Sequence, residues 1–192
     1  GDPADLVRPD GARPGDSLVV TTGPAAEIAG LFATVYPQEL NLPAETVATA
    51  QERVADIKVV ADARAASATG DVSAMHDATE GGLQGALVEM ARGASVRFDV
   101  DAEQVPTAPG ASAVCEAAGV DPWTVSSAGT LVIAVARRDA DAVVAALRER
   151  DTRAAVVGSV REGQGVFVDG ERRAMPEADP SWAAAERLVD DG

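Results

Sequence analysis

The sequence predicts an α+β fold in which helices pack on a mixed β-sheet. Stretches of strand length alternate irregularly with stretches of helical periodicity along the 192 residues. Residues 130–136 form a continuous apolar run, which is typical of a central strand. Glycine turns on either side of residues 166–168 add a hairpin near the end of the chain. This mixture suits a sheet that is covered by helices.

The first half of the chain is expected to open with a buried strand at residues 17–21. A helix then starts at Gly23-Pro24, where proline is tolerated in the first turn, and stops at Pro37. Residues 57–60 fit either a brief strand or a continuation of the helix before them. The apolar positions expected to face the core in these helices are Ile28, Leu31, Phe32, Val35, Val47 and Val54. The other expected elements are helices at 43–56 and 61–68, a strand at 72–75, and a helix that ends near Gly93.

The second half begins with a strand at residues 95–100, where polar and apolar residues alternate. Asp139 is placed to cap the helix after the central strand, and that helix presents Val143, Val144 and Leu147 to the core. The remaining expected elements are a helix at 108–118, a polar loop at 121–129, strands at 154–157 and 166–168, and a terminal helix at 182–189.

Residues 1–11 are rich in Pro, Gly and Asp and are expected to be a linker or tail. Residues 12–192 are then one domain, by the usual size of domains. The chain does not begin with methionine, so we expect it to be cut from a longer protein.

The formal net charge of −15 argues against a nucleic-acid-binding surface. Lys58 is the only lysine, and many Asp, Ala and Val residues indicate a salt-adapted, halophilic source. An acidic partner-binding face ranks second, because the acids are spread along the chain. No apolar run reaches the ~20 residues of a membrane span and no signal peptide opens the chain, which predicts a cytoplasmic protein without a membrane partner. Cys115 stands alone, and a buried small hydrophobe is favoured over a nucleophile.

The segment Met75-His76-Asp77-Ala78-Thr79-Glu80-Gly81-Gly82-Leu83 concentrates most of the chemistry. It contains the only histidine and opens an amphipathic helix. Free N–H groups at such a turn bind anions, so the turn is a candidate phosphate site. Two glycines in a first helical turn cost roughly 0.5–1 kcal/mol each. That cost indicates that a ligand or another chain segment approaches the backbone.

Each candidate residue in this turn also has a possible structural role. Asp77 and Glu80 have the spacing of a capping box, and a histidine beside a cap is often only hydrogen-bonded. His76 and Asp77 remain the candidates for acid–base chemistry. No cluster of histidine and cysteine supports a zinc site, and two carboxylates alone are a weak magnesium signal, so no metal site is predicted. The candidate ligand-binding residues are Thr79, Glu80, Gly81, Gly82, Ser126 and Ser127.

These segments together resemble the C-terminal domain of the PurM-like superfamily, which includes AIR synthase-related and HypE-like proteins. Residues 75–83 resemble the family's His-Asp-x-Thr-x-Gly-Gly turn, and residues 12–21 resemble its Arg-Pro-Gly-Asp strand. Residues 127–135, with 156–160 beyond them, resemble its closing half. The resemblance covers about residues 12–170.

The resemblance implies a parent enzyme that uses ATP to phosphorylate an amide or carbonyl oxygen. It implies that an N-terminal ATP-binding domain of the same parent holds ATP and Mg²⁺, that this chain is inactive alone, and that the parent is a homodimer. Nothing in the sequence looks like that N-terminal domain. Glu80 stands where HypE-like turns carry arginine, and the terminal cysteine of HypE proteins is missing, so a hydrogenase-cyanide role is not expected. The alternative is a non-enzymatic dimerisation or ligand-sensing module.

Overall fold

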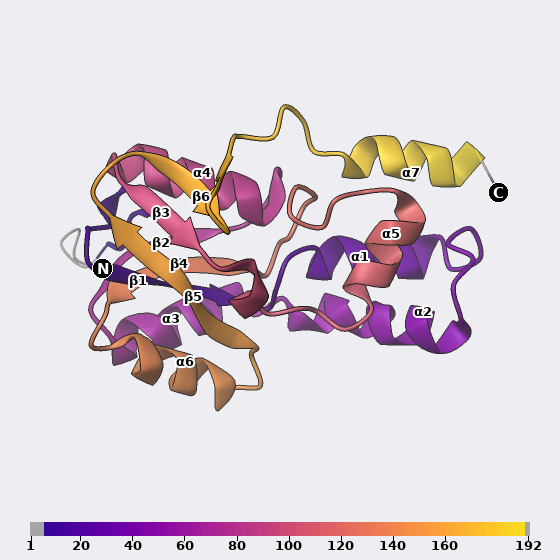
Figure 1. Ribbon diagram of the computed structural model, residues 1–192. Coiled ribbons are helices and arrows are strands. Elements are labelled where there is room, and N and C mark those ends of the chain that lie inside the picture. Colours follow the sequence, from indigo (N-terminus) through magenta and orange to yellow (C-terminus); the bar gives the residue numbers. More distant parts are fainter. Residues whose placement is uncertain (1–5, 191–192) are drawn as a thin grey trace.

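The computed structural model describes residues 6–190, and within them the strands form one mixed seven-stranded sheet (Figure 1). The sheet order is β2-β4-β1-β5-β3-β6-β7. Neighbouring strands are antiparallel except β3 and β6, which are parallel. The strands are β1 (Asp16–Thr21), β2 (Val72–Asp77), β3 (Arg97–Val100), β4 (Leu131–Ala136), β5 (Ala154–Arg161), β6 (Gly165–Val168) and β7 (Glu171–Arg173).

Helices cover both faces of the sheet and extend the molecule at one end (Figure 1). The helix α4 packs on one face, α3 and α6 pack on the other, and α1, α2, α5 and α7 gather beyond the sheet. The helices are α1 (Ala26–Val35), α2 (Ala44–Gln51), α3 (Val59–Thr69), α4 (Gly82–Ala94), α5 (Ala111–Ala118), α6 (Ala140–Arg148) and α7 (Ser181–Asp190). The predicted α+β class, with helices on a mixed sheet, is therefore confirmed. No helix in residues 6–190 is long and apolar enough to cross a membrane.

The strand β1 lies at the centre of the sheet, between β4 and β5, and is buried along its whole length. Leu18 and Val20 belong to the apolar cluster under α4, whereas Val19 belongs to the cluster under α3 and α6. This alternation is the two-residue period of a strand with both faces covered. The strand β4 is also buried, as the apolar run at residues 130–136 predicted.

Several predicted details of the helices are wrong. Leu31 and Val35 are 45% and 52% exposed, because α1 packs against α2 and α5 through Ile28 and Phe32 instead. The expected helix at residues 43–56 ends at Gln51, and residues 52–56 form a 3-10 helix. That turn rotates Val54 outward, to 49% exposed. Residues 57–60 form no strand, since α3 begins at Val59.

The second half also differs from the prediction in three places. Asp139 stands at the N-cap of α6, but its carboxylate accepts from the backbone N–H of Asp71 (3.0 Å) instead of capping the helix. The strand β5 was expected to end at Gly158 but continues to Arg161. Because Gly158 has no side chain, the backbone of Asp99 can lie close to it. The exposed strand β7 has no apolar pattern and was not predicted.

The N-terminal segment contacts the sheet over its described part. Pro9–Gly11 form a 3-10 turn that lies against β2 and α4. The backbone of Gly11 approaches Ser73 so closely that a side chain at position 11 would collide with it. The expected linker over residues 1–11 begins outside the described residues, and the domain boundary stays a prediction.

Candidate functional site

The turn between β2 and α4 is built on two glycines in the left-handed region. Gly81 has φ +78° and Gly82 has φ +62°. Gly81 occupies the N-cap position of α4, and the N–H of Gly82 donates to the carbonyl of Thr79 (3.0 Å). Residues with a Cβ adopt this conformation at a cost of roughly 1–2 kcal/mol each. The sequence Gly81-Gly82 therefore makes the sharp passage from strand to helix possible.

Another part of the chain fills the space beside Gly82. A Cβ at Gly82 would lie 2.5 Å from the carbonyl oxygen of Val125 and 2.6 Å from that of Trp123. The Trp123 carbonyl also accepts from the N–H of Gln84 (2.9 Å). The sequence indicated that either a ligand or another chain segment approaches this backbone. At Gly82 it is a chain segment, the loop at residues 121–129.

The C-terminal segment lies over Gly81. The N–H of Gly81 donates to Oδ2 of Asp179 (3.2 Å), and Met175 Cε is 3.7 Å from where a Gly81 Cβ would stand. The side chain of Gln84 donates to the carbonyl of Ala174 (2.8 Å). The N–H groups of Gly81, Gly82 and Gln84 are thus all taken by acceptors within the protein, and a carboxylate already stands at the positive end of α4.

The capping box considered as a structural role for Asp77 and Glu80 does not form. Asp77 is the last residue of β2, and the N-cap of α4 is Gly81, which makes no side-chain capping bond. Glu80 has no hydrogen-bond partner among residues 6–190. The acid that serves the helix end is Asp179, which sequence reasoning missed. The sequence Asp-Pro-Ser at residues 179–181 could have indicated it, because aspartate often caps a helix and proline is favoured in the first turn that follows.

His76 is held by a carboxylate of α4. Its Nε2 lies 2.8 Å from Oε2 of Glu89, and its Nδ1 lies 3.8 Å from Oδ1 of Asp77. Because a carboxylate at this position accepts, the Nε2–H is the donor. His76 and Asp77 border an open groove of about 740 Å³ between β2 and α3. The structure thus brings the two candidate acid–base residues to one groove.

Glu80 and Ser126 border a different and smaller space. This space, the acidic hollow, has a volume of about 190 Å³ and lies where α1 and the start of α7 approach the glycine turn. Glu27, Glu80 and Asp179 line it together with Ser126 and Ser181, and no basic side chain does. The rest of its lining is apolar and consists of Ile28, Leu31, Phe32, Trp182 and Ala185. Three carboxylates disfavour a phosphate here and favour groups that donate hydrogen bonds. Two of the predicted ligand-binding residues, Glu80 and Ser126, therefore border a different space from His76 and Asp77.

The two serines of the loop at residues 121–129 have different roles. The Ser126 hydroxyl donates to Oε2 of Glu27 (3.0 Å) at the edge of the acidic hollow. Ser127 is fully buried, where its oxygen accepts from the N–H of Ala25 (2.8 Å) and its hydroxyl donates to the Val125 carbonyl (2.9 Å). Ser127 is therefore a structural residue that joins two loops. Thr79 is exposed and contributes its carbonyl to the turn.

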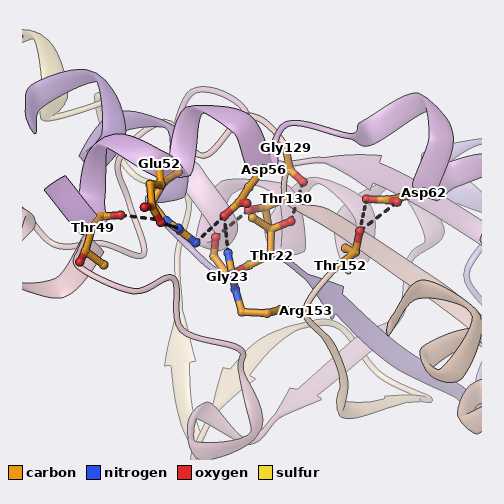
Figure 2. Close-up of polar contacts among 11 residues, drawn as sticks. Thr22, Gly23, Thr49, Glu52, Asp56, Asp62, Gly129, Thr130, Thr152 and Arg153 are labelled. Atoms are coloured by element: carbon orange, nitrogen blue, oxygen red, sulfur yellow. Dashed lines mark hydrogen bonds and ion pairs between the residues drawn. The ribbon is translucent and has the colours of Figure 1, made fainter. Parts of the chain in front are cut away.

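Buried polar contacts fasten the loop after β1 to the start of β4, as Figure 2 shows. The Thr130 hydroxyl donates to the Gly23 carbonyl (2.7 Å), and the Thr22 hydroxyl donates to the Gly129 carbonyl (3.1 Å). Thr22 has φ +62°, which is rare for a β-branched residue and is held by these bonds. Sequence reasoning named both segments but did not predict their contact, because they are more than 100 residues apart in the chain.

Ion pairs extend the same network behind the loops (Figure 2). Asp56 lies between Arg153 (2.6 Å) and Arg53 (3.0 Å), and Arg153 also donates to the Thr22 carbonyl (3.1 Å). Nearby, the fully buried Asp62 accepts from the Thr152 hydroxyl (3.0 Å). These contacts hold the 3-10 helix and α3 against the ends of the sheet.

Within residues 6–190, no three His, Cys, Asp or Glu side chains are grouped closely enough to hold a metal ion. Cys115 is 1% exposed and belongs to the apolar cluster of α1, α5 and α7. Burial, with a smaller contribution from the charge of Asp121, raises the pKa of the Cys115 thiol to about 12. The prediction of a buried small hydrophobe is confirmed.

Comparison with known proteins gives relatives over most of the chain. Carbamoyl dehydratase HypE of Rhizobium leguminosarum bv. viciae is 35% identical over 164 residues, which are 84% of this chain and 45% of that protein. The crystal structure of HypE from E. coli superimposes with a TM-score of 0.75 at 27% identity, over 91% of this chain and 54% of that one. A HypE structure in complex with ATP has a TM-score of 0.66 at 25% identity, over 91% and 55% of the two chains.

The chain thus spans about half the length of the relatives it matches. The model of the family described as "AIR synthase related protein, C-terminal domain" matches residues 13–171, from the strand β1 and its preceding turn to the start of β7. The glycine turn, the loop at 121–129 and the network of Figure 2 all lie inside this match. The chain therefore belongs to the AIR synthase-related family, as a C-terminal domain of the PurM-like type.

Proposed function

We propose that this chain is the C-terminal half of a two-domain, ATP-dependent enzyme. It becomes catalytic only when joined to an N-terminal ATP-binding domain of the same parent chain. The observation that carries the proposal is the half-length match to carbamoyl dehydratases, together with a relative whose structure holds ATP. The parent would use ATP to phosphorylate an amide or carbonyl oxygen, which turns that oxygen into a leaving group for dehydration or for attack by an amine.

The acidic hollow does not fit the nucleotide. Its volume of about 190 Å³ is below the roughly 300 Å³ at which ligand pockets begin. Its carboxylates would repel a triphosphate, and three N–H groups at the glycine turn have acceptors within the protein. We therefore assign the binding of ATP and Mg²⁺ to the N-terminal domain of the parent protein.

The residues that line the acidic hollow suit the binding of a substrate amide. Glu80 has no hydrogen-bond partner among the described residues, so its carboxylate is free to accept from an amide N–H. Ser126 is oriented by Glu27 at the same edge (3.0 Å). A substrate amide held in this way would present its oxygen away from the acids. The His76–Glu89 pair remains a candidate for proton transfer in the neighbouring groove.

The proposal includes three properties of the parent. It would be a homodimer, it would be cytoplasmic, and its surface would be adapted to salt. The cytoplasm suits a chain whose lone cysteine is a buried thiol. The net charge of −15 suits a solution in which salt screens the repulsion between acids. A non-enzymatic dimerisation or sensing module is less well supported, because the relatives are named as dehydratases.

A substrate-dependent ATPase assay on the parent protein tests this role. Glu80→Gln keeps the shape of the side chain but removes its charge, and should raise the KM for the amide substrate while ATP binding stays unchanged. The matched control is Glu177→Gln, since Glu177 is exposed and lies outside the acidic hollow. Equal kinetics for the two variants would remove Glu80 from the site. A stable dimer with no ATPase under any substrate would support the module instead.

A further inference from the structure

The open groove between β2 and α3 also contains the first described residues of the chain. Leu6, Val7 and Pro9 line it together with α3 and the end of β2, and its volume is about 740 Å³. We call this space the β2–α3 groove. Most of its other lining residues are apolar, namely Val59, Ala63, Ala68, Met75 and Leu131. An apolar surface that is left open in this way is typical of a site where another protein segment binds.

The strand beside the groove is an edge of the sheet. Within residues 6–190, β2 pairs with β4 on one side and with no strand on the other. The turn at Pro9–Gly11 lies against the first half of this open edge, where Gly11 meets the Ser73 carbonyl. The second half, from Met75 to Asp77, borders the groove. Such edges are usually paired or covered, because their free N–H and C=O groups promote association with other chains.

The outer face of α3 has no acidic side chain, although the protein is strongly acidic. The chain has 31 acidic residues, and each of the other six α-helices in residues 6–190 carries at least one acid that is not buried. The only acid of α3, Asp62, is fully buried. The exposed positions of α3 are Val60, Ala61, Arg64, Ser67, Ala68 and Thr69. Depletion of acids on one face is typical of a surface that is covered by a partner.

An exposed apolar rim continues the groove. Val60 is 72% exposed, the highest value among the large apolar side chains of residues 6–190, and Leu6 is 69% exposed. Val60 stands one helical turn before Arg64, which lines the groove, so the two side chains lie on the same face of α3. Single exposed apolar side chains are ordinary on a protein surface. Here, however, Leu6 and Val60 belong to one groove and its rim.

We propose that the β2–α3 groove is the surface on which the N-terminal half of the parent protein docks. The inference rests on the proposed function, which supplies the two-domain parent. This chain spans about half the length of its relatives, and its first described residues lie in the groove, so the preceding half of the parent joins the domain at this surface. A second copy of this chain suits the groove less well, because it would bring another net charge of −15 to the interface.

Docking at this surface places the candidate acid–base residues between the two halves. His76, whose Nε2 lies 2.8 Å from Glu89, and Asp77 both border the groove. In the docked parent they lie beside the half to which ATP is assigned, and the covering domain restricts the access of water to them. Each half then contributes residues to one site, which accounts for the expected inactivity of this chain alone.

Thiol labelling tests the proposal with two matched variants, Ala68→Cys on α3 and Ala142→Cys on α6. Both alanines are exposed and stand on helices that pack on the same face of the sheet, but only Ala68 lines the groove. In the 192-residue chain the two cysteines should react at similar rates. In the parent, the Ala68→Cys thiol should react at least about tenfold more slowly, because it is accessible only in a minor undocked population. Ala142→Cys should react at the same rate in both proteins.

A charge placed on the rim tests whether docking causes this protection. Val60→Asp should leave the folding of the chain unchanged, because Val60 is exposed, but it should restore fast labelling of Ala68→Cys in the parent, since docking would bury the new carboxylate. Val189→Asp is the matched control, because Val189 is 61% exposed on α7 and lies outside the groove. It should leave the protection unchanged. Thermal unfolding of each variant shows that it is folded.

Equal labelling of Ala68→Cys in the parent and in the chain overturns the proposal, as does equal loss of protection in Val60→Asp and Val189→Asp. Protection in the 192-residue chain itself, with concentration-dependent sedimentation, overturns it in favour of a second copy. A measurement of ATP binding by the same parent separates this inference from the proposed function. A protected Ala68→Cys in a parent that binds no ATP supports docking and contradicts the enzyme, whereas ATP binding with an unprotected thiol contradicts docking alone.

Discussion

A side chain at Gly82 would meet the backbone of Val125, because a Cβ at Gly82 lies 2.5 Å from the Val125 carbonyl oxygen. The glycine turn and the loop at residues 121–129 are therefore packed main chain against main chain. This relationship explains why a helix begins with a residue that costs stability in a helix. It also means that the turn is completed by the protein and not by a ligand alone.

Gly82→Ala should destabilise the protein more than Gly81→Ala. Both residues have positive φ, which costs roughly 1–2 kcal/mol with a Cβ. Only Gly82 also faces two carbonyl oxygens, and such overpacking adds about 1–3 kcal/mol. Urea unfolding measures the free energies of the two variants. Equal losses would show that the loop at 121–129 does not lie against Gly82.

Asp179→Ala should loosen the start of α7 and expose the glycine turn. Its carboxylate accepts from the Gly81 N–H (3.2 Å), the Ser181 N–H (2.9 Å) and the Ser181 hydroxyl (2.6 Å). Loss of a cap of this kind costs about 1 kcal/mol. Hydrogen exchange should become faster at Gly81 and in α7. Glu177→Ala, at an exposed position of the same segment, is the control and should leave both rates unchanged.

Cys115 should react with a thiol reagent only after unfolding at pH 8. Burial raises the pKa of its thiol from 9.0 to about 12, so the folded state favours the neutral form. The neutral thiol therefore contributes to the free energy of unfolding. This contribution is fully present below pH 9 and is lost as the pH rises toward 12. Cys115→Ala should therefore lose less unfolding free energy than the wild type between pH 8 and pH 11. Rapid labelling of the native protein would contradict the burial.

High salt should stabilise the protein. A net charge of −15 makes the folded chain repel itself, and ions screen this repulsion over a Debye length of about 10 Å at 0.1 M salt. Urea unfolding at KCl concentrations from 0.1 to 2 M should give rising midpoints. A flat series would count against the salt-adapted source that the composition indicates.

Much of the fold could be predicted because its signals are local. The apolar runs of β1 and β4 and the periodicity of α4 are all recovered. The order of the sheet could not be predicted, since it joins strands that are far apart in the chain. The exposed β7, with the sequence Glu-Arg-Arg, carries no pattern that distinguishes it from a loop.

The candidate site residues stay a prediction, and the structure divides them between two spaces. Glu80 and Ser126 do border one hollow, whereas His76 and Asp77 border another. The contacts that decide the chemistry come from elsewhere in the chain, namely Glu27 and Asp179. No local pattern places these acids beside the turn, because only the packing of α1 and α7 brings them there.

The measurement that tests the central claim most directly is calorimetric titration of ATP, with Mg²⁺, into the parent protein and into the 192-residue chain side by side. The proposal predicts saturable binding to the parent and none to the chain alone, because the nucleotide belongs to the N-terminal domain. A parent that binds no ATP at millimolar concentration in suitable salt would contradict the enzyme. Tight binding by the 192-residue chain at the acidic hollow would contradict the division of roles between the two halves.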